Sequence, residues 1–81
     1  MSTKLEMTKG QIEERFVYLD RLRVSGVTNM FGARPYLERQ FGLATPVARQ
    51  VLLIWMQSFD GVSDMDRRIE RALEIMEERA A

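Results

Sequence analysis

The side chains that could do chemistry in this sequence are carboxylates, arginines and two lysines, because the chain has neither histidine nor cysteine. Histidine is the commonest general base and metal ligand, and cysteine supplies the thiolate nucleophile. The acids occur in pairs such as Glu13–Glu14 and Asp64–Asp66, which helix starts and solvated faces explain, and Asp60-Gly61 lacks calcium-loop spacing. We therefore expect a protein that is not an enzyme, with no metal site and no small-molecule cofactor.

A polar and aromatic segment at residues 27–36 is the strongest candidate for a binding site. Its side chains are of the types enriched at the centres of protein interfaces, and the candidate partner-binding residues are Asn29, Met30, Phe31, Arg34 and Tyr36. A structural role fits some of them equally well, because Met30 and Phe31 could close the end of the core. Whether these two are core or exposed stays open at this level. The segment predicts a surface that binds a protein partner.

Residues 35–58 support an alternative, a helix-turn-helix that binds DNA. A helix at 36–41 is followed by Gly42-Leu43-Ala44 as the turn and by a second helix that begins at Thr45. The apolar run 51–56 weakens this interpretation, because a recognition helix must be polar where it enters the groove. The residues that would face DNA are Arg34, Arg39, Thr45, Arg49 and Gln50.

The charges are unevenly distributed, although 12 basic and 12 acidic residues give a net charge of zero. Residues 1–14 carry a net charge of −1, and residues 50–81 carry −3. Between them, residues 15–49 hold six arginines against Asp20 and Glu38, a net charge of +4. Such asymmetry can steer a partner, although ordinary solvated faces would also produce it.

Local start and stop signals indicate the helices that must position these residues. Thr8 and Gln11 have the spacing of a capping box, and Gly26 suits the end of the same helix, which we expect at 9–25. Its apolar residues recur at helical spacing and form one stripe toward the core: Ile12, Phe16, Leu19 and Leu22. A single turn capped by Thr28 or Asn29 should follow.

The second half of the chain predicts three more helices. One runs near 35–41 and ends at Gly42, and the next, at 47–59, starts with Thr45 as cap before Pro46. Because 51–56 is apolar on nearly every face, this helix should be the centre of a bundle, with Trp55 and Phe59 in the core. Ser63 should cap an amphipathic helix at 63–79. The fold class is therefore all-α, a small compact bundle of three to four helices.

The chain also resembles a family of short proteins from tailed bacteriophages and prophages. The resemblance begins with the stretch 18–37 and is most specific at Thr28-Asn29-Met30-Phe31-Gly32-Ala33 and Pro35-Tyr36-Leu37. It continues through 41–43, 48–49, 51–53 and 55–59, and it covers about half of the chain. It implies an accessory protein that acts inside the bacterial cell on a host enzyme, a defence complex or DNA. No catalytic or binding residues carry over. Many members stop soon after the position of Phe59, so the helix at 63–79 is a departure.

These observations predict one helical domain at residues 1–81, with a flexible N-terminus at 1–8 and a candidate oligomerisation helix at 63–79. The longest apolar run has six residues, against about 20 for a membrane span, and we expect a cytoplasmic protein without membrane contact. The expected function is a non-enzymatic interaction module that binds and modulates a host or phage protein, for example as an inhibitor during host takeover. The alternatives are a DNA-binding regulator and a purely structural role in a virion, and a second copy of the chain, as a homodimer, is an open candidate for the partner.

Overall fold

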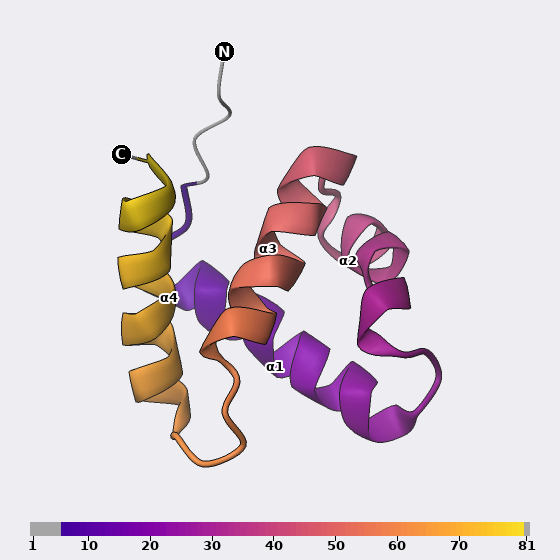
Figure 1. Ribbon diagram of the computed structural model, residues 1–81. Coiled ribbons are helices and arrows are strands. Elements are labelled where there is room, and N and C mark those ends of the chain that lie inside the picture. The colour runs from indigo at the N-terminus through magenta and orange to yellow at the C-terminus, as the bar shows by residue number, and fades with distance from the viewer. Residues whose placement is uncertain (1–5, 81) are drawn as a thin grey trace.

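The computed structural model describes residues 6–80 and contains four α-helices in this range. In chain order the elements are α1 (Lys9–Ser25), the 3-10 turn η1 (Met30–Gly32), α2 (Arg34–Phe41), α3 (Thr45–Ser58) and α4 (Met65–Ala80). No strand occurs within residues 6–80. The expected all-helical bundle is therefore confirmed (Figure 1).

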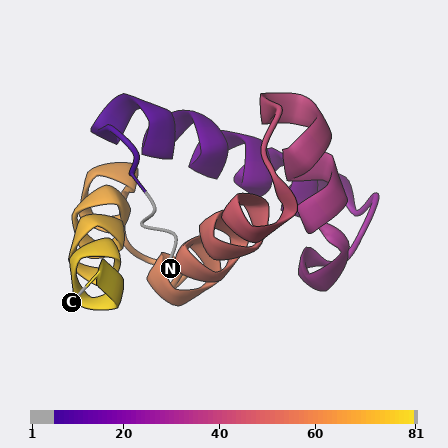
Figure 2. The same ribbon diagram turned by 90° about the horizontal axis from the view of Figure 1, so that it is seen from above.

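The central helix is α3, as its apolar composition predicts. It packs against α2 on one side and α4 on the other, and α1 crosses behind it to reach α4 (Figures 1 and 2). The expectation that α3 is covered on nearly every face is wrong at Leu53, which is 38% exposed. With four helices in the bundle, one face of α3 is left without a neighbour.

The ends of α1 follow the sequence signals. The Thr8 hydroxyl accepts from the Gln11 amide at 3.1 Å, and the Gln11 side chain accepts from the Thr8 amide at 3.0 Å. Gly26 closes the helix with φ of 70°, a left-handed conformation that glycine adopts without steric cost. Of the N-terminal segment expected to be flexible, residues 1–5 lie outside the described residues, while Met7 packs against the core.

The cap predicted for α3 is wrong in detail. Helix α3 begins at Thr45 itself, after Ala44, and no side chain caps it. The Thr45 hydroxyl instead donates to a Glu38 oxygen at 3.1 Å, because α2 brings this carboxylate to the start of α3. Helix α2 also begins one residue earlier than expected, at Arg34.

The cap of α4 is also displaced by one residue. The Asp64 carboxylate accepts from the Arg67 amide at 2.9 Å, so Asp64 and not Ser63 caps the helix. The Ser63 hydroxyl donates to Asp60, which also accepts from the Ser63 amide at 2.7 Å. No helix within the described residues is long and apolar enough to cross a bilayer.

The core is shared by all four helices. Helix α1 contributes its predicted stripe, α3 contributes Trp55 at 2% exposure, and Phe59 beside it is half-buried. The buried hydrophobic residues are Ile12, Phe16, Leu19, Leu22, Ala33, Leu37, Ala48, Val51, Leu52, Ile54, Trp55, Ile69, Ala72 and Ile75.

Candidate functional site: an exposed apolar patch around Phe31

Three exposed apolar side chains lie within a short stretch at one end of the bundle. Val24 in the last turn of α1 is 81% exposed, Val27 is 59% exposed, and Phe31 in η1 is 83% exposed. We call these three residues, which lie close together in the sequence, the Phe31 patch. The connection that carries it runs along the side of the molecule opposite α4 (Figures 1 and 2). A nearly fully exposed phenylalanine is unusual, because burying such a side chain stabilises a protein by about 1.5–3 kcal/mol.

The backbone of η1 directs Phe31 outward. In a 3-10 helix residues three apart lie on the same side, so Met30 and Ala33 share the face toward the core. Ala33 is fully buried, and Met30 is half-buried against the core cluster. Phe31, between them in sequence, points away from that face. The Asn29 side chain accepts from the Gly32 amide at 2.9 Å and caps the turn, as the sequence predicts.

Gly32 keeps this turn tight. A Cβ atom at this position would lie 2.5 Å from the Thr28 Oγ1 atom, a distance that real Cβ atoms essentially never show. Any larger residue would push the turn or the Thr28 side chain away. The glycine therefore lets the Thr28 hydroxyl lie against the turn.

The structure separates the five predicted partner-binding residues. Only Phe31 presents a largely exposed side chain of the anchoring type; Asn29 is exposed but serves as a cap, and Met30 is half-buried. Arg34 forms an ion pair with Glu38. Tyr36 is half-buried, and its carbonyl lies 3.5 Å from the hydroxyl of Tyr18.

Val24 and Val27 are the members of the patch that sequence reasoning missed. A signal for Val24 was present, because it follows the buried Leu22 by two positions. Two positions on an α-helix correspond to about 200°, so Val24 must lie nearly opposite the core stripe. An apolar residue on the polar side of an amphipathic helix marks a candidate contact.

The residues of the DNA-binding alternative are spread over α2 and α3. Arg49 is exposed and Gln50 half-buried on α3, and Arg39 on α2 lies over the Tyr36 ring, 5.6 Å from its centroid. Thr45 and Arg34 both contact Glu38, so a carboxylate lies at the start of the would-be recognition helix. Both side chains are therefore engaged with a carboxylate in place of a phosphate.

Both carboxylates of the basic middle region already have partners. Glu38 pairs with Arg34 and accepts from Thr45. Asp20 accepts two hydrogen bonds from Arg68 and one from the Trp55 indole. Burial raises the pKa of Asp20, but these hydrogen bonds and the charges of Arg68 and Arg23 outweigh it and hold the pKa below 3.8. Arg15 pairs with Glu14 at 3.9 Å, whereas Arg21, Arg39 and Arg49 form no ion pair within residues 6–80.

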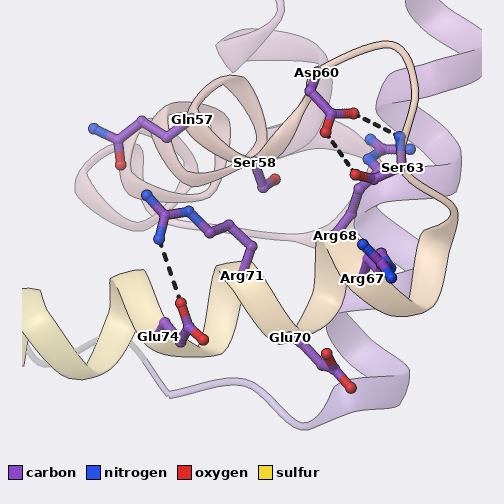
Figure 3. A pocket seen from close by; sticks show the side chains of 9 residues that line it. All are labelled: Gln57, Ser58, Asp60, Ser63, Arg67, Arg68, Glu70, Arg71 and Glu74. Atoms are coloured by element: carbon purple, nitrogen blue, oxygen red, sulfur yellow. Dashed lines mark hydrogen bonds and ion pairs between the residues drawn. The ribbon is translucent and has the colours of Figure 1, made fainter.

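A second feature is a cleft of about 510 Å³ between the end of α3 and α4 (Figure 3). Of its arginines, Arg71 pairs with Glu74 of the same lining at 3.3 Å, and Arg68 pairs with Asp20 outside the lining. Hydrogen bonds from the Ser63 hydroxyl and from the Ser63 and Val62 amides lower the pKa of Asp60 to about 2. Within the described residues no three acids gather to hold a metal ion. The lining of the cleft is balanced in charge, with three arginines and three acids.

No protein-family model, curated protein or solved structure matches the chain.

Proposed function

We propose that this chain is a small non-enzymatic interaction module that binds a protein partner through the Phe31 patch. The observation that carries the proposal is the 83% exposure of Phe31 on a capped turn. The resemblance to phage and prophage proteins adds the setting, a phage-encoded protein that modulates a host or phage protein in the bacterial cytoplasm.

The turn that carries Phe31 is preorganised for binding. Binding costs less when the anchoring side chain is already held in place, because fewer rotatable bonds are frozen on association. The cap from Asn29, the tight fit at Gly32 and the buried Ala33 hold the backbone on both sides of Phe31. An aromatic anchor presented in this way is typical of the energetic centres of protein interfaces.

Site-specific photo-crosslinking tests the proposal. A photoreactive amino acid replaces Phe31 in one variant and Gln57, exposed on α3, in a matched control. We expect a defined protein adduct at position 31 in bacterial cells, absent at position 57. The purified adduct partner should bind the wild-type chain and lose about tenfold or more in affinity with Phe31→Ala. Equal crosslinking at both positions would contradict the proposal.

The helix-turn-helix regulator is the alternative. It is supported by the three-residue connection 42–44 between α2 and α3, closed by Gly42 with φ of 65°, and by the exposed Arg49. It predicts binding to duplex DNA that weakens steeply with salt and with Arg49→Ala, and is unaffected by Phe31→Ala. A gel-shift titration at low salt measures this binding, and the absence of a shift would exclude the alternative.

A further inference from the structure

Arg68 of α4 occupies a site that is built by α1 and the end of α3. Its guanidinium lies 5.4 Å from the centroid of the Phe16 ring and 5.1 Å from that of Phe59. Both of its Nη atoms donate to the Asp20 carboxylate, at 2.7 and 2.8 Å. A carboxylate that accepts two parallel hydrogen bonds, beside aromatic rings, fits the planar guanidinium of arginine better than the ammonium group of lysine.

The groups that receive Arg68 also contact one another. The Trp55 indole donates to Asp20 Oδ1 at 2.9 Å. The Trp55 ring stacks on that of Phe59 with their centroids 5.0 Å apart, and the Arg23 guanidinium lies 4.8 Å from the Phe59 centroid. These contacts join α1 to the end of α3 and involve no residue of α4. The arrangement of the site is therefore supported from outside α4.

Helix α4 is held less tightly than α1 or α3. Three of its apolar side chains are buried, two isoleucines and one alanine, against four on α1 and five on α3. The Arg68 Nε atom is buried and has no hydrogen-bond partner in the described part of the chain, which opposes its burial. A helix with few buried apolar contacts opens at a lower free energy than the rest of the fold.

The connection before α4 does not tie this helix to the bundle. Residues 59–64 are not helical, and Val62 within them is 91% exposed. Their turn is closed locally, because Asp60 accepts from the Val62 and Ser63 amides at 2.9 and 2.7 Å. The cap of α4 is local too, from Asp64 to the amide three positions on. None of these hydrogen bonds has to break when α4 leaves α1 and α3.

We propose that α1 and the end of α3 form a binding site for an arginine-bearing amphipathic helix, which α4 occupies within the chain and releases to a helix of a partner protein. The ligand pattern is that of α4: an arginine followed by apolar residues one, four and seven positions on, as Ile69, Ala72 and Ile75 follow Arg68. This site is separate from the Phe31 patch, which lies on the side of the molecule opposite α4 (Figure 1). The proposal is therefore independent of the proposed function.

The test weakens α4 within the full chain and supplies the helix from outside. The weakening is needed because a short tether holds α4 at an effective concentration in the millimolar range, above that of an added peptide. The chain carries Arg68→Gln, and the ligand is a fluorescently labelled synthetic peptide of residues 63–80, titrated by anisotropy. We expect saturable binding of this natural peptide. The same peptide with Arg68→Gln should bind at least about tenfold more weakly, because it cannot pair with Asp20.

Three controls assign the binding to this site. A peptide with Arg67→Gln changes the neighbouring exposed arginine and should bind within about twofold of the natural peptide. Asp20→Asn, added to the Arg68→Gln chain, should bring the natural and Arg68→Gln peptides within about twofold of each other, because the carboxylate that distinguishes them is gone. Phe31→Ala, added to the same chain, should leave binding of the natural peptide unchanged.

The same titration decides the matter if the Arg68→Gln chain is unfolded on its own. It is then followed by circular dichroism, and the natural peptide should restore helix beyond the sum of the two components, while the Arg68→Gln peptide should not. Neither binding nor refolding with the natural peptide would overturn the proposal. Equal affinity of the natural and Arg68→Gln peptides for a chain that retains Asp20 would overturn it as well.

Hydrogen exchange of the wild-type chain tests the release of α4 separately. We expect the amides in the middle of α4 to exchange at least about tenfold faster than those in the middle of α1 and α3, because α4 opens without global unfolding. Equal protection of the three helices would mean that α4 leaves only when the whole chain unfolds, and it would overturn the release.

Discussion

Arg68 on α4 donates two hydrogen bonds to Asp20 on α1, from Nη1 to Oδ2 at 2.7 Å and from Nη2 to Oδ1 at 2.8 Å. Trp55 on α3 donates its indole N–H to the same Oδ1 at 2.9 Å. One carboxylate thus joins three helices. The Arg68 guanidinium also lies between two rings, 5.4 Å from the centroid of Phe16 and 5.1 Å from that of Phe59.

Asp20→Ala should destabilise the fold by about 3 kcal/mol, because it leaves the buried Arg68 cation without a counter-charge. Arg71→Ala, which removes the exposed pair with Glu74, should change stability by less than about 1 kcal/mol. Urea unfolding followed by circular dichroism measures both values. Equal effects of the two substitutions would mean that the Asp20 contact does not hold the helices together.

The same carboxylate should make stability fall in acid. The folded state holds the pKa of Asp20 below 3.8, so the unfolded chain binds its proton first as the pH drops. The contribution of Asp20 is therefore complete well above pH 3.8 and is lost as the pH falls below that value toward the lowered pKa. Urea midpoints measured against pH should show a steeper acid decline for wild type than for Asp20→Asn. Parallel curves would exclude this role.

Phe31→Ala should leave stability within about 0.5 kcal/mol, because the side chain is largely exposed and supports no core contact. Phe16→Ala removes a ring of the same type from a fully buried position and should cost about 3–5 kcal/mol. Thermal and urea unfolding of the pair give a direct comparison. A loss of more than about 1.5 kcal/mol for Phe31→Ala would show that this ring is buried in solution.

Gly32→Ala should destabilise the chain by about 1–2 kcal/mol, because the new Cβ overlaps the Thr28 hydroxyl. Thr28→Ala removes the overlapping atom, so the double variant should recover most of the loss relative to Thr28→Ala alone. A double-mutant cycle in urea measures the coupling energy between the two positions. If the free-energy changes of the two substitutions simply add, the turn adapts to the new Cβ atom and the two side chains do not interact.

Several parts of the fold could be predicted because their signals are local. The capping box at Thr8 and the glycine ends of α1 and α2 involve residues at most a few positions apart. The caps predicted at Thr45 and Ser63 are displaced. Their hydroxyl groups donate to carboxylates, Glu38 seven positions from Thr45 and Asp60 three positions from Ser63.

The candidate site was predicted only in part. The composition of 27–36 indicated an interface, and Phe31 was among its candidates. The exposure of Phe31 depends on the direction in which η1 turns, which the burial of Ala33 determines.

The sequence by itself determined the fold class, the helices and the composition of the core, because periodicity and caps act over a few residues. Tertiary structure alone decided that Arg68, at the edge of the apolar stripe of α4, pairs with Asp20, 48 positions away. It also decided that Phe31 is exposed while the neighbouring Met30 packs inward. The physical reason is the same in both cases: burial is set by which helices meet, and those contacts join residues far apart in the chain.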